Sequence, residues 1–150
     1  MKIVLQEVLK ASVTIEDKLY SSINKGYLLL VSFTEGDNLE ILEKMANKIT
    51  KLRVFLDENG KTNLSLNDVK GEILSVSQFT IYADLRKGNR PSYINCMRPD
   101  EASILYDKFN EVLRNLGYKV EVGVFGADMK VELINDGPYT LVIDSKELGF

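Results

Sequence analysis

Hydrophobic and polar residues follow one another along the chain in a pattern that predicts mostly strands. Residues 2–8 are mainly apolar, and residues 11–16 alternate with the period of two that is typical of a half-buried strand. Gly26 precedes a continuous apolar run over residues 27–33, which predicts a central strand. Further strands are predicted at residues 53–56, 72–78, 118–124, 129–134 and 139–144.

Two segments carry helical spacing instead. The first helix is predicted to begin at Asp37, because Asp37 followed by Glu40 resembles a capping box. The second is predicted to begin at Pro99 and Asp100 and to end at Gly117, because glycine adopts the left-handed conformation after a helix without strain. The predicted buried positions are Leu42, Met45, Ala46, Ile49 and Leu52 in the first helix, and Leu105, Phe109, Val112, Leu113 and Leu116 in the second.

The order of these elements predicts the fold class. The strands are grouped and do not alternate regularly with helices, which favours an α+β fold over a doubly wound sheet. We expect a mainly antiparallel, barrel-like sheet with two amphipathic helices. The 150 residues contain no repeat or linker, so residues 1–150 are interpreted as one domain.

Composition narrows the class of protein. A hydrophobic content of 45% with 27% charged residues is ordinary for a globular protein, and no apolar run approaches the roughly 18 residues that span a bilayer. The single cysteine, Cys96, excludes an internal disulfide and fits a reducing compartment. Without histidine, a zinc site of the common kinds is not expected. We therefore expect a cytoplasmic protein that contacts no membrane and uses no metal or other cofactor.

The charge balance bears on nucleic acid binding. A net charge of −3 and a pI near 5.1 argue against non-specific coating of nucleic acid, which requires a broad basic surface, and we expect no DNA partner. Arg86, Lys87 and Arg90 form the one tight basic cluster. From composition alone this cluster is either a solvated loop or a local contact for a phosphate backbone.

The candidate chemistry lies at the end of the predicted strand 72–78, in Ser77-Gln78-Phe79-Thr80. Polar groups beside apolar walls are typical of binding sites. Thr80 is a candidate nucleophile, but a threonine hydroxyl needs a base, and the nearest acid in sequence is Asp84. The other interpretation is that Thr80 orders the pocket while water attacks.

Several short motifs occur together, and their order and spacing are more specific than any one of them. By these motifs the chain resembles the D-aminoacyl-tRNA deacylase family, also called D-tyrosyl-tRNA deacylase, over nearly its whole length. The matching pieces are Ala11-Ser12-Val13-Thr14, Asn63-Leu64-Ser65-Leu66, Val76-Ser77-Gln78-Phe79-Thr80, Arg86-Lys87-Gly88, Arg90-Pro91-Ser92, Phe125-Gly126-Ala127-Asp128-Met129 and Asn135-Asp136-Gly137-Pro138.

The resemblance implies a hydrolase that cleaves the ester between a D-amino acid and the terminal adenosine of tRNA. It also implies a homodimer in which Gly137-Pro138, a cis peptide, enters the pocket of the other subunit and rejects L-aminoacyl groups. The local residues alone predict a hairpin turn at that point, since Asn, Asp, Gly and Pro are turn formers. Phe125 and Met129 would line the adenine pocket, although both residue types are more often core. Arg86, Lys87 and Arg90 would contact phosphates of the acceptor end.

One departure from the family pattern leaves alternatives open. The family usually carries arginine where this chain has Glu7, at a position that helps to hold the Gly-Pro loop. Strict rejection of L-aminoacyl and glycyl substrates is therefore in question. The alternatives are a relaxed editing hydrolase for L-alanyl- or glycyl-tRNA and a non-catalytic tRNA-binding module. Cys96 is interpreted as a structural thiol, because no histidine is present to activate it.

Overall fold

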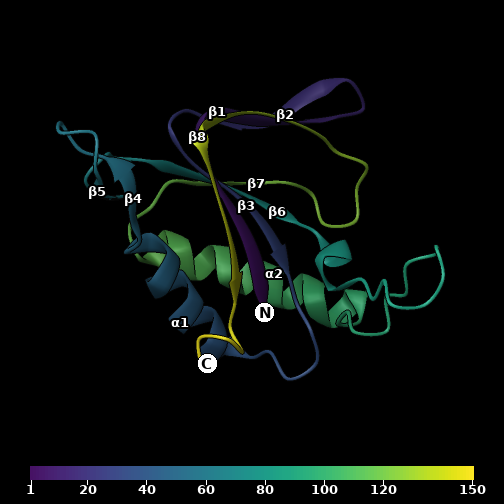
Figure 1. The fold of residues 1–150 in the computed structure, drawn as a ribbon. Coiled ribbons are helices and arrows are strands. Elements are labelled where there is room, and N and C mark those ends of the chain that lie inside the picture. Colours follow the sequence, from purple (N-terminus) through teal and green to yellow (C-terminus); the bar gives the residue numbers. More distant parts are fainter.

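The computed structural model describes residues 1–150 and contains a curled sheet with two helices packed on one face (Figure 1). The strands of this sheet are β1 (Lys2–Ile15), β2 (Lys18–Ile23), β3 (Gly26–Ser32), β6 (Glu72–Ser77), β7 (Val120–Val122) and β8 (Lys130–Asp144). The strands β4 (Arg53–Leu56) and β5 (Thr62–Ser65) form a separate pair. The helices are α1 (Leu39–Thr50) and α2 (Pro99–Asn115), and a 3₁₀ helix, η1, spans Phe79–Tyr82.

The sheet is organised around the long strand β1. Antiparallel pairing joins β1 to β3, to β2 and, along its other edge, to β8. Beyond β3, the strands β6 and β7 continue the sheet in parallel. The sheet curls until β2 approaches β7, where Ser21 Oγ donates to the Val122 carbonyl at 2.9 Å. This nearly closed sheet with two helices confirms the predicted α+β, barrel-like fold.

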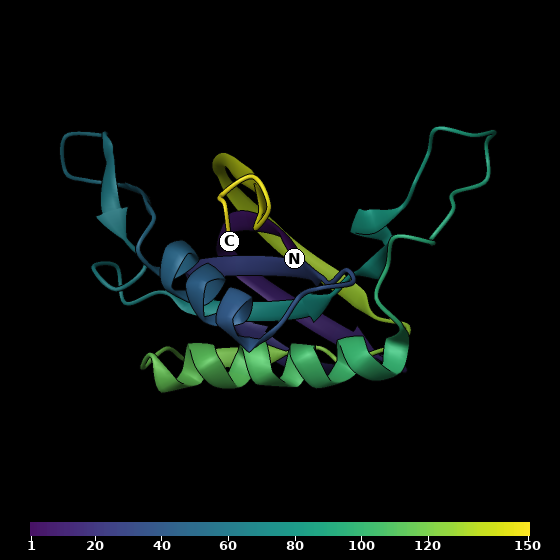
Figure 2. The same ribbon diagram turned by 90° about the horizontal axis from the view of Figure 1, so that it is seen from below.

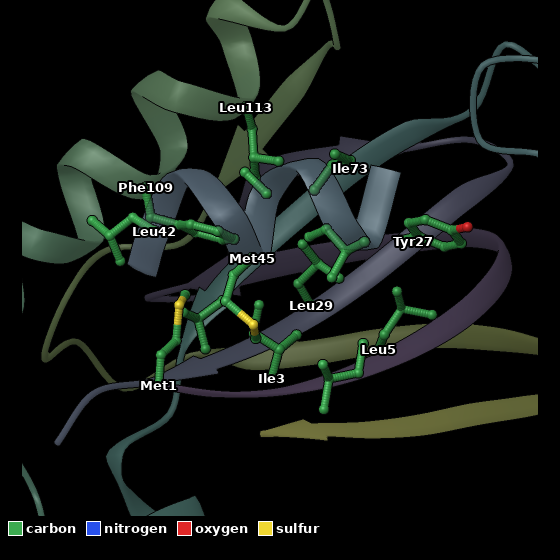
Figure 3. Packing of buried hydrophobic residues seen from close by; sticks show 14 of the residues in the cluster. Met1, Ile3, Leu5, Tyr27, Leu29, Leu42, Met45, Ile73, Phe109 and Leu113 are labelled. Atoms are coloured by element: carbon green, nitrogen blue, oxygen red, sulfur yellow. The ribbon is translucent and has the colours of Figure 1, made fainter. Parts of the chain in front are cut away.

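Alternation along the strands sends side chains into two hydrophobic clusters. Both helices cover the same face of the sheet (Figure 2), and the larger cluster lies between them and the strands. There Ile3, Leu5 and Leu29 meet Met45 of α1 and Phe109 of α2 (Figure 3). The smaller cluster contains Val8, Ala11, Val13, Ile23, Leu28, Leu74 and Val76. Because each large buried side chain contributes roughly 1.5–3 kcal/mol, the two clusters hold the strands in register.

The start of α1 differs from the predicted capping box. The N-cap residue is Asn38, whose Oδ1 accepts a hydrogen bond from the Ile41 N–H at 3.2 Å. Asp37 instead accepts from the Thr34 N–H and from the buried amino group of Met1. The contact with Met1 takes Asp37 away from the predicted cap. Because Met1 is distant in sequence, the local pattern of residues could not predict this contact.

The predicted start and end of α2 are confirmed, but its buried face is partly different. Gly117 follows the C-cap with φ at +92°. The buried residues are Ala102, Tyr106, Phe109, Asn110 and Leu113. Tyr106 Oη donates to the Ser75 carbonyl at 2.7 Å, so a polar contact helps to set the rotation of the helix and leaves Leu116 exposed. Neither helix has the length and apolar character needed to cross a membrane.

The strand β8 replaces the two strands and the hairpin turn that the local residues predicted. Both halves of β8 pair with β1, and the register shifts on either side of Val8. Residues 136–139 consequently have only Glu7 opposite them. These four residues form a β-bulge, which we call the bulge. The hairpin interpretation is wrong because the chain keeps the same partner strand before and after the turn-forming residues.

The strands β3 and β6 approach each other very closely at Gly26. A Cβ atom on Gly26 would lie only 1.9 Å from the Glu72 carbonyl oxygen. The parallel register begins at this point, with Gly26 opposite Glu72, and ends with Val31 opposite Ser77. A residue without a side chain is therefore required where the pairing starts. The pair at Gly26 belongs to the same register that places Val31 opposite Ser77.

Candidate functional site

The four residues Ser77, Gln78, Phe79 and Thr80, called the reaction segment from here on, leave the sheet at the end of β6. Ser77 is the last residue of β6, and the Gln78 N–H donates to the Val31 carbonyl at 2.8 Å. The chain then turns into η1, with Phe79 and Thr80 exposed. The first N–H groups of a helical turn have no intrahelical acceptor. The segment thus offers main-chain donors, a hydroxyl and an aromatic ring at the end of a buried strand.

The Thr80 hydroxyl is hydrogen-bonded to an amide and not to a base. Gln78 Nε2 donates to Thr80 Oγ1 at 2.5 Å. No lysine or carboxylate forms a hydrogen bond with this hydroxyl, and the chain has no histidine. A hydroxyl without a base is a weak nucleophile, so the geometry favours an ordering role for Thr80.

Phe125 and Met129 lie at the same end of β6, in the connection between β7 and β8. The Phe125 ring packs on Tyr106 with 6.1 Å between ring centroids, and Tyr106 bonds to the Ser75 carbonyl. Met129 Sδ lies against Gly123, whose N–H donates to the same carbonyl at 2.9 Å. Both side chains are half-buried. Each therefore packs on the core on one side and remains partly exposed near the end of β6.

The bulge is exposed and is held by a side chain of its own strand. The Gly137-Pro138 peptide bond is cis, and both residues are exposed. Asn135 Oδ1 accepts a hydrogen bond from the Tyr139 N–H at 2.9 Å and so closes the bulge. Gly137 has φ at +118°, a conformation that favours glycine, and a Cβ atom there would lie 3.1 Å from the Tyr139 nitrogen.

Within one chain, the bulge and the reaction segment lie apart. The strands β1 and β3 separate β8 from β6, which amounts to three strand spacings or roughly 14 Å across the sheet. Glu7 is level with Tyr27 and Ile73, four residues before Ser77, or roughly 13 Å along the strands. The fold therefore brings Phe125 and Met129 to the end of β6 from which the reaction segment emerges, but leaves the bulge on the far side of the sheet.

The three candidate phosphate contacts lie on the exposed loop of residues 83–98, which projects beyond one end of the sheet (Figure 2). Arg86 is paired with Asp84, with 2.8 Å from Nε to Oδ1 and 2.6 Å from Nη2 to Oδ2. This guanidinium lowers the pKa of Asp84 to about 2. Lys87 and Arg90 form no ion pair. Two of the three cations are therefore free to meet an external phosphate.

Glu7 lies beside the bulge as a buried carboxyl group without a counter-ion. It is only 5% exposed and has no cation within ion-pair distance. Burial raises the pKa of Glu7, the charge of Asp136 raises it further, and Lys25 opposes the change. No cation therefore tethers the bulge from this position.

Two further residues reach the reaction segment. Ser32 Oγ and Cys96 Sγ both donate hydrogen bonds to the Phe79 carbonyl oxygen, at 3.3 Å and 3.2 Å. Ser32 lies in none of the matching motifs, and Cys96 was interpreted only as a structural thiol. These contacts join residues 47 and 17 positions apart, so no local pattern could have revealed them.

Comparison with known proteins gives matches over nearly the whole chain. Residues 4–144 match the family model described as "D-Tyr-tRNA(Tyr) deacylase". A D-aminoacyl-tRNA deacylase of Lactobacillus gasseri is 56% identical over 144 residues, which cover 96% of this chain and 99% of that protein. The protein of the same name from Bacillus velezensis is 52% identical over 147 residues, covering 98% of this chain and 100% of the relative.

Two solved structures are similar in fold. One is described as "c-Myc DNA Unwinding Element Binding Protein" and is 40% identical, with a TM-score of 0.90 over 96% of this chain and 98% of that one. The other is described as a probable eukaryotic D-amino acid tRNA deacylase and has a TM-score of 0.84 over 95% of this chain and 97% of that one. At 17% identity, this second likeness concerns the fold alone.

Proposed function

Because the chain belongs to the D-Tyr-tRNA(Tyr) deacylase family, we propose that it hydrolyses the ester bond between a D-amino acid and the terminal adenosine of tRNA. The products are the free D-amino acid and tRNA. The observation that carries the proposal is the make-up of the reaction segment, which offers main-chain donors at the exposed residues Phe79 and Thr80 and a hydroxyl without a base. An aminoacyl ester is already activated, so positioning and charge stabilisation suffice for its hydrolysis.

In this mechanism water attacks the ester carbonyl, and Thr80 orders the pocket. A main-chain N–H near Phe79 stabilises the oxyanion that forms, a contribution of roughly 3–4 kcal/mol for one well-aimed donor. The neighbouring ribose hydroxyl of the tRNA assists proton transfer. Phe125 and Met129 hold the adenine ring, since an aromatic face and a polarisable thioether suit a purine.

A second copy of the chain completes the pocket in this proposal. The bulge is far from the reaction segment of its own chain, so it can serve only the reaction segment of another. The strand β8 supports this arrangement, because it pairs with β1 alone and presents a free edge of 15 residues. Ile134 and Val142 are large apolar side chains that β8 leaves exposed in a single copy.

The bulge of the second copy selects the hand of the amino acid. The carbonyl oxygens of Gly137 and Pro138 accept hydrogen bonds from the amino group of a D-aminoacyl ester. An L-aminoacyl ester bound through the same amino group would direct its side chain against Pro138. The family resemblance supports this role, and so does the exposure of both residues at the crest of the bulge.

Deacylation of D-tyrosyl-, L-tyrosyl- and glycyl-tRNA, measured side by side, tests the activity. We expect hydrolysis of the D-tyrosyl ester and little of the L-tyrosyl ester. Hydrolysis of none of the three would contradict the proposal and leave a tRNA-binding module.

Mixing two inactive variants tests the shared pocket. One variant carries Phe79→Gly in the reaction segment, and the other carries Gly137→Ala in the bulge. Random exchange of subunits restores one intact pocket in each mixed dimer, so activity should return to about a quarter of the wild-type value. Each variant mixed with itself is the control, and a mixture that stays inactive would argue against a pocket shared between subunits.

A second candidate function is an editing hydrolase with relaxed chirality, and Glu7 favours it. This residue places an acid, not a cation, beside the bulge, and its carboxyl group has no ion pair. A loosely held bulge would exclude L-alanine or glycine poorly. Comparable rates for D-tyrosyl-, L-alanyl- and glycyl-tRNA would support this candidate, and D-selectivity of two orders of magnitude or more would exclude it.

A further inference from the structure

The carbonyl group of Phe79 is held by two side chains from other parts of the chain. Ser32 lies at the end of β3 and is only 1% exposed, and its hydroxyl donates to Phe79 O at 3.3 Å. Cys96 lies in the loop of residues 83–98, and its thiol donates to the same oxygen at 3.2 Å. These donors hold the carbonyl from the strand on one side and from the loop on the other.

Holding this carbonyl also orients the next amide group. A peptide unit is planar, and Gly137-Pro138 is the one cis bond of the chain, so the Phe79-Thr80 bond is trans. In a trans unit the N–H of Thr80 points away from the Phe79 carbonyl. Ser32 and Cys96 therefore fix the direction in which a main-chain donor of the reaction segment points.

The loop that carries Cys96 is itself anchored at its base. Thr34 Oγ1 donates to the Asn95 carbonyl at 2.7 Å, and the Met97 N–H donates to the Phe33 carbonyl at 3.0 Å. The same loop bears the unpaired cations that could meet tRNA phosphates. A thiol with this anchoring is a fixed support for Phe79 and joins the loop to the reaction segment.

We propose that Ser32 and Cys96 are positioning residues for ester hydrolysis, because they orient the Phe79-Thr80 peptide unit toward the ester carbonyl. This inference rests on the proposed deacylase function and deepens it. Neither side chain contacts the reacting atoms; each acts through the Phe79 carbonyl. Burial raises the pKa of the Cys96 thiol, so the thiol keeps the proton that it donates at neutral pH.

Single-turnover deacylation of D-tyrosyl-tRNA by Ser32→Ala, Cys96→Ala and the double variant tests the proposal. We expect each single change to lower the rate of the chemical step about tenfold and the double change about a hundredfold, with the Kd for tRNA unchanged. Cys96→Ser keeps a donor and should restore most of the rate. Ser21→Ala is the matched control, because Ser21 Oγ makes the same kind of bond to a carbonyl outside the reaction segment, that of Val122.

Methyl methanethiosulfonate gives a second test that does not depend on a folded variant. Cys96 is the only cysteine, so its sulfur alone displaces methanesulfinate and becomes a methyl disulfide, which has no donor proton. Modification, followed by mass spectrometry, should slow the wild-type enzyme, dithiothreitol should restore its rate, and Cys96→Ser should be insensitive.

The outcomes separate this inference from the proposed function. A wild-type protein that hydrolyses no aminoacyl-tRNA contradicts the deacylase function itself. An active wild-type protein whose modified form and Ser32→Ala variant react as fast as the Ser21→Ala control would overturn the positioning role alone. Equal loss of rate and of tRNA affinity would also overturn it, because it would indicate a general loss of structure.

Discussion

The two segments of the proposed pocket, the reaction segment and the bulge, are held in different ways. The reaction segment follows a central strand and is fixed by a main-chain bond to Val31 and by Ser32 and Cys96. The bulge lies on an edge strand, and Asn135 is the side chain that closes it. The fold of one chain therefore holds the proposed catalytic half in place, whereas the proposed selective half presents its residues outward from an edge strand.

The largest expected effect comes from a Cβ atom in the bulge. Gly137→Ala should lower deacylation of D-tyrosyl-tRNA about a hundredfold, because the left-handed conformation and the close Tyr139 nitrogen both oppose the new atom. Gly60→Ala is the control, since Gly60 also has positive φ but has nothing within 4 Å. The control should lose about 1 kcal/mol of unfolding free energy but should keep its full activity. Similar activities of the two variants would show that the bulge has no catalytic role.

The next effect concerns the loop beside the reaction segment. Lys87→Ala with Arg90→Ala should weaken tRNA binding about tenfold and reduce the slope of log K against log salt by about 1.5–2, because two phosphate contacts are lost. Arg86→Ala should have a smaller effect, since Asp84 already occupies its guanidinium. The exposed Lys18 on β2 provides a matched control. Unchanged slopes would indicate that the loop is solvated and makes no contact with tRNA phosphates.

A smaller effect, on stability, is expected at Glu7, which lies opposite the bulge. The folded pKa of Glu7 is raised above its ordinary value of 4.5, so the folded state keeps its proton to a higher pH than the unfolded state does. The stability of the wild type should therefore fall as pH rises from about 4.5 through the folded pKa. Glu7→Gln removes this dependence. Thermal unfolding from pH 4 to pH 8 should show the variant gaining up to roughly 2–4 °C over the wild type at the alkaline end. A constant difference would contradict the burial of an ionisable group at this position.

The smallest effect is expected at Thr80. Thr80→Ala should keep the single-turnover rate within about threefold of the wild type, because the hydroxyl orders the segment and does not attack the ester. A loss of several orders of magnitude would instead establish Thr80 as the nucleophile and would require a base outside the reaction segment.

Much of this architecture could be predicted from local patterns. Apolar runs and helical spacing located both helices, the central strand β3 and the end of β6 where the reaction segment begins. The predictions that were wrong concern residues whose structure depends on partners distant in sequence. The pattern around Asp37 does not show that its carboxylate accepts a hydrogen bond from the Met1 amino group. Nor could β8 be predicted as one strand, because its continuity depends on pairing with β1.

The site divides in the same way. The reaction segment, the Gly137-Pro138 peptide, Phe125 and Met129 were predicted as site residues from their motifs, and the structure shows where each of them lies. The distance between the two halves follows from the strand order, which no local pattern contains. The bonds from Ser32 and Cys96 likewise require the folded chain.

Gly26 has a consequence for the sequences that this fold tolerates. Its close approach to Glu72 sets the β3–β6 register, and that register decides where Ser77 emerges, roughly 17 Å further along the strand. In a mutational scan selected for activity, position 26 should therefore accept only glycine and be as intolerant as a pocket residue, although it lies far from any substrate. A map of intolerance drawn from such a scan would mark two places, the pocket itself and the point where its supporting strands first meet.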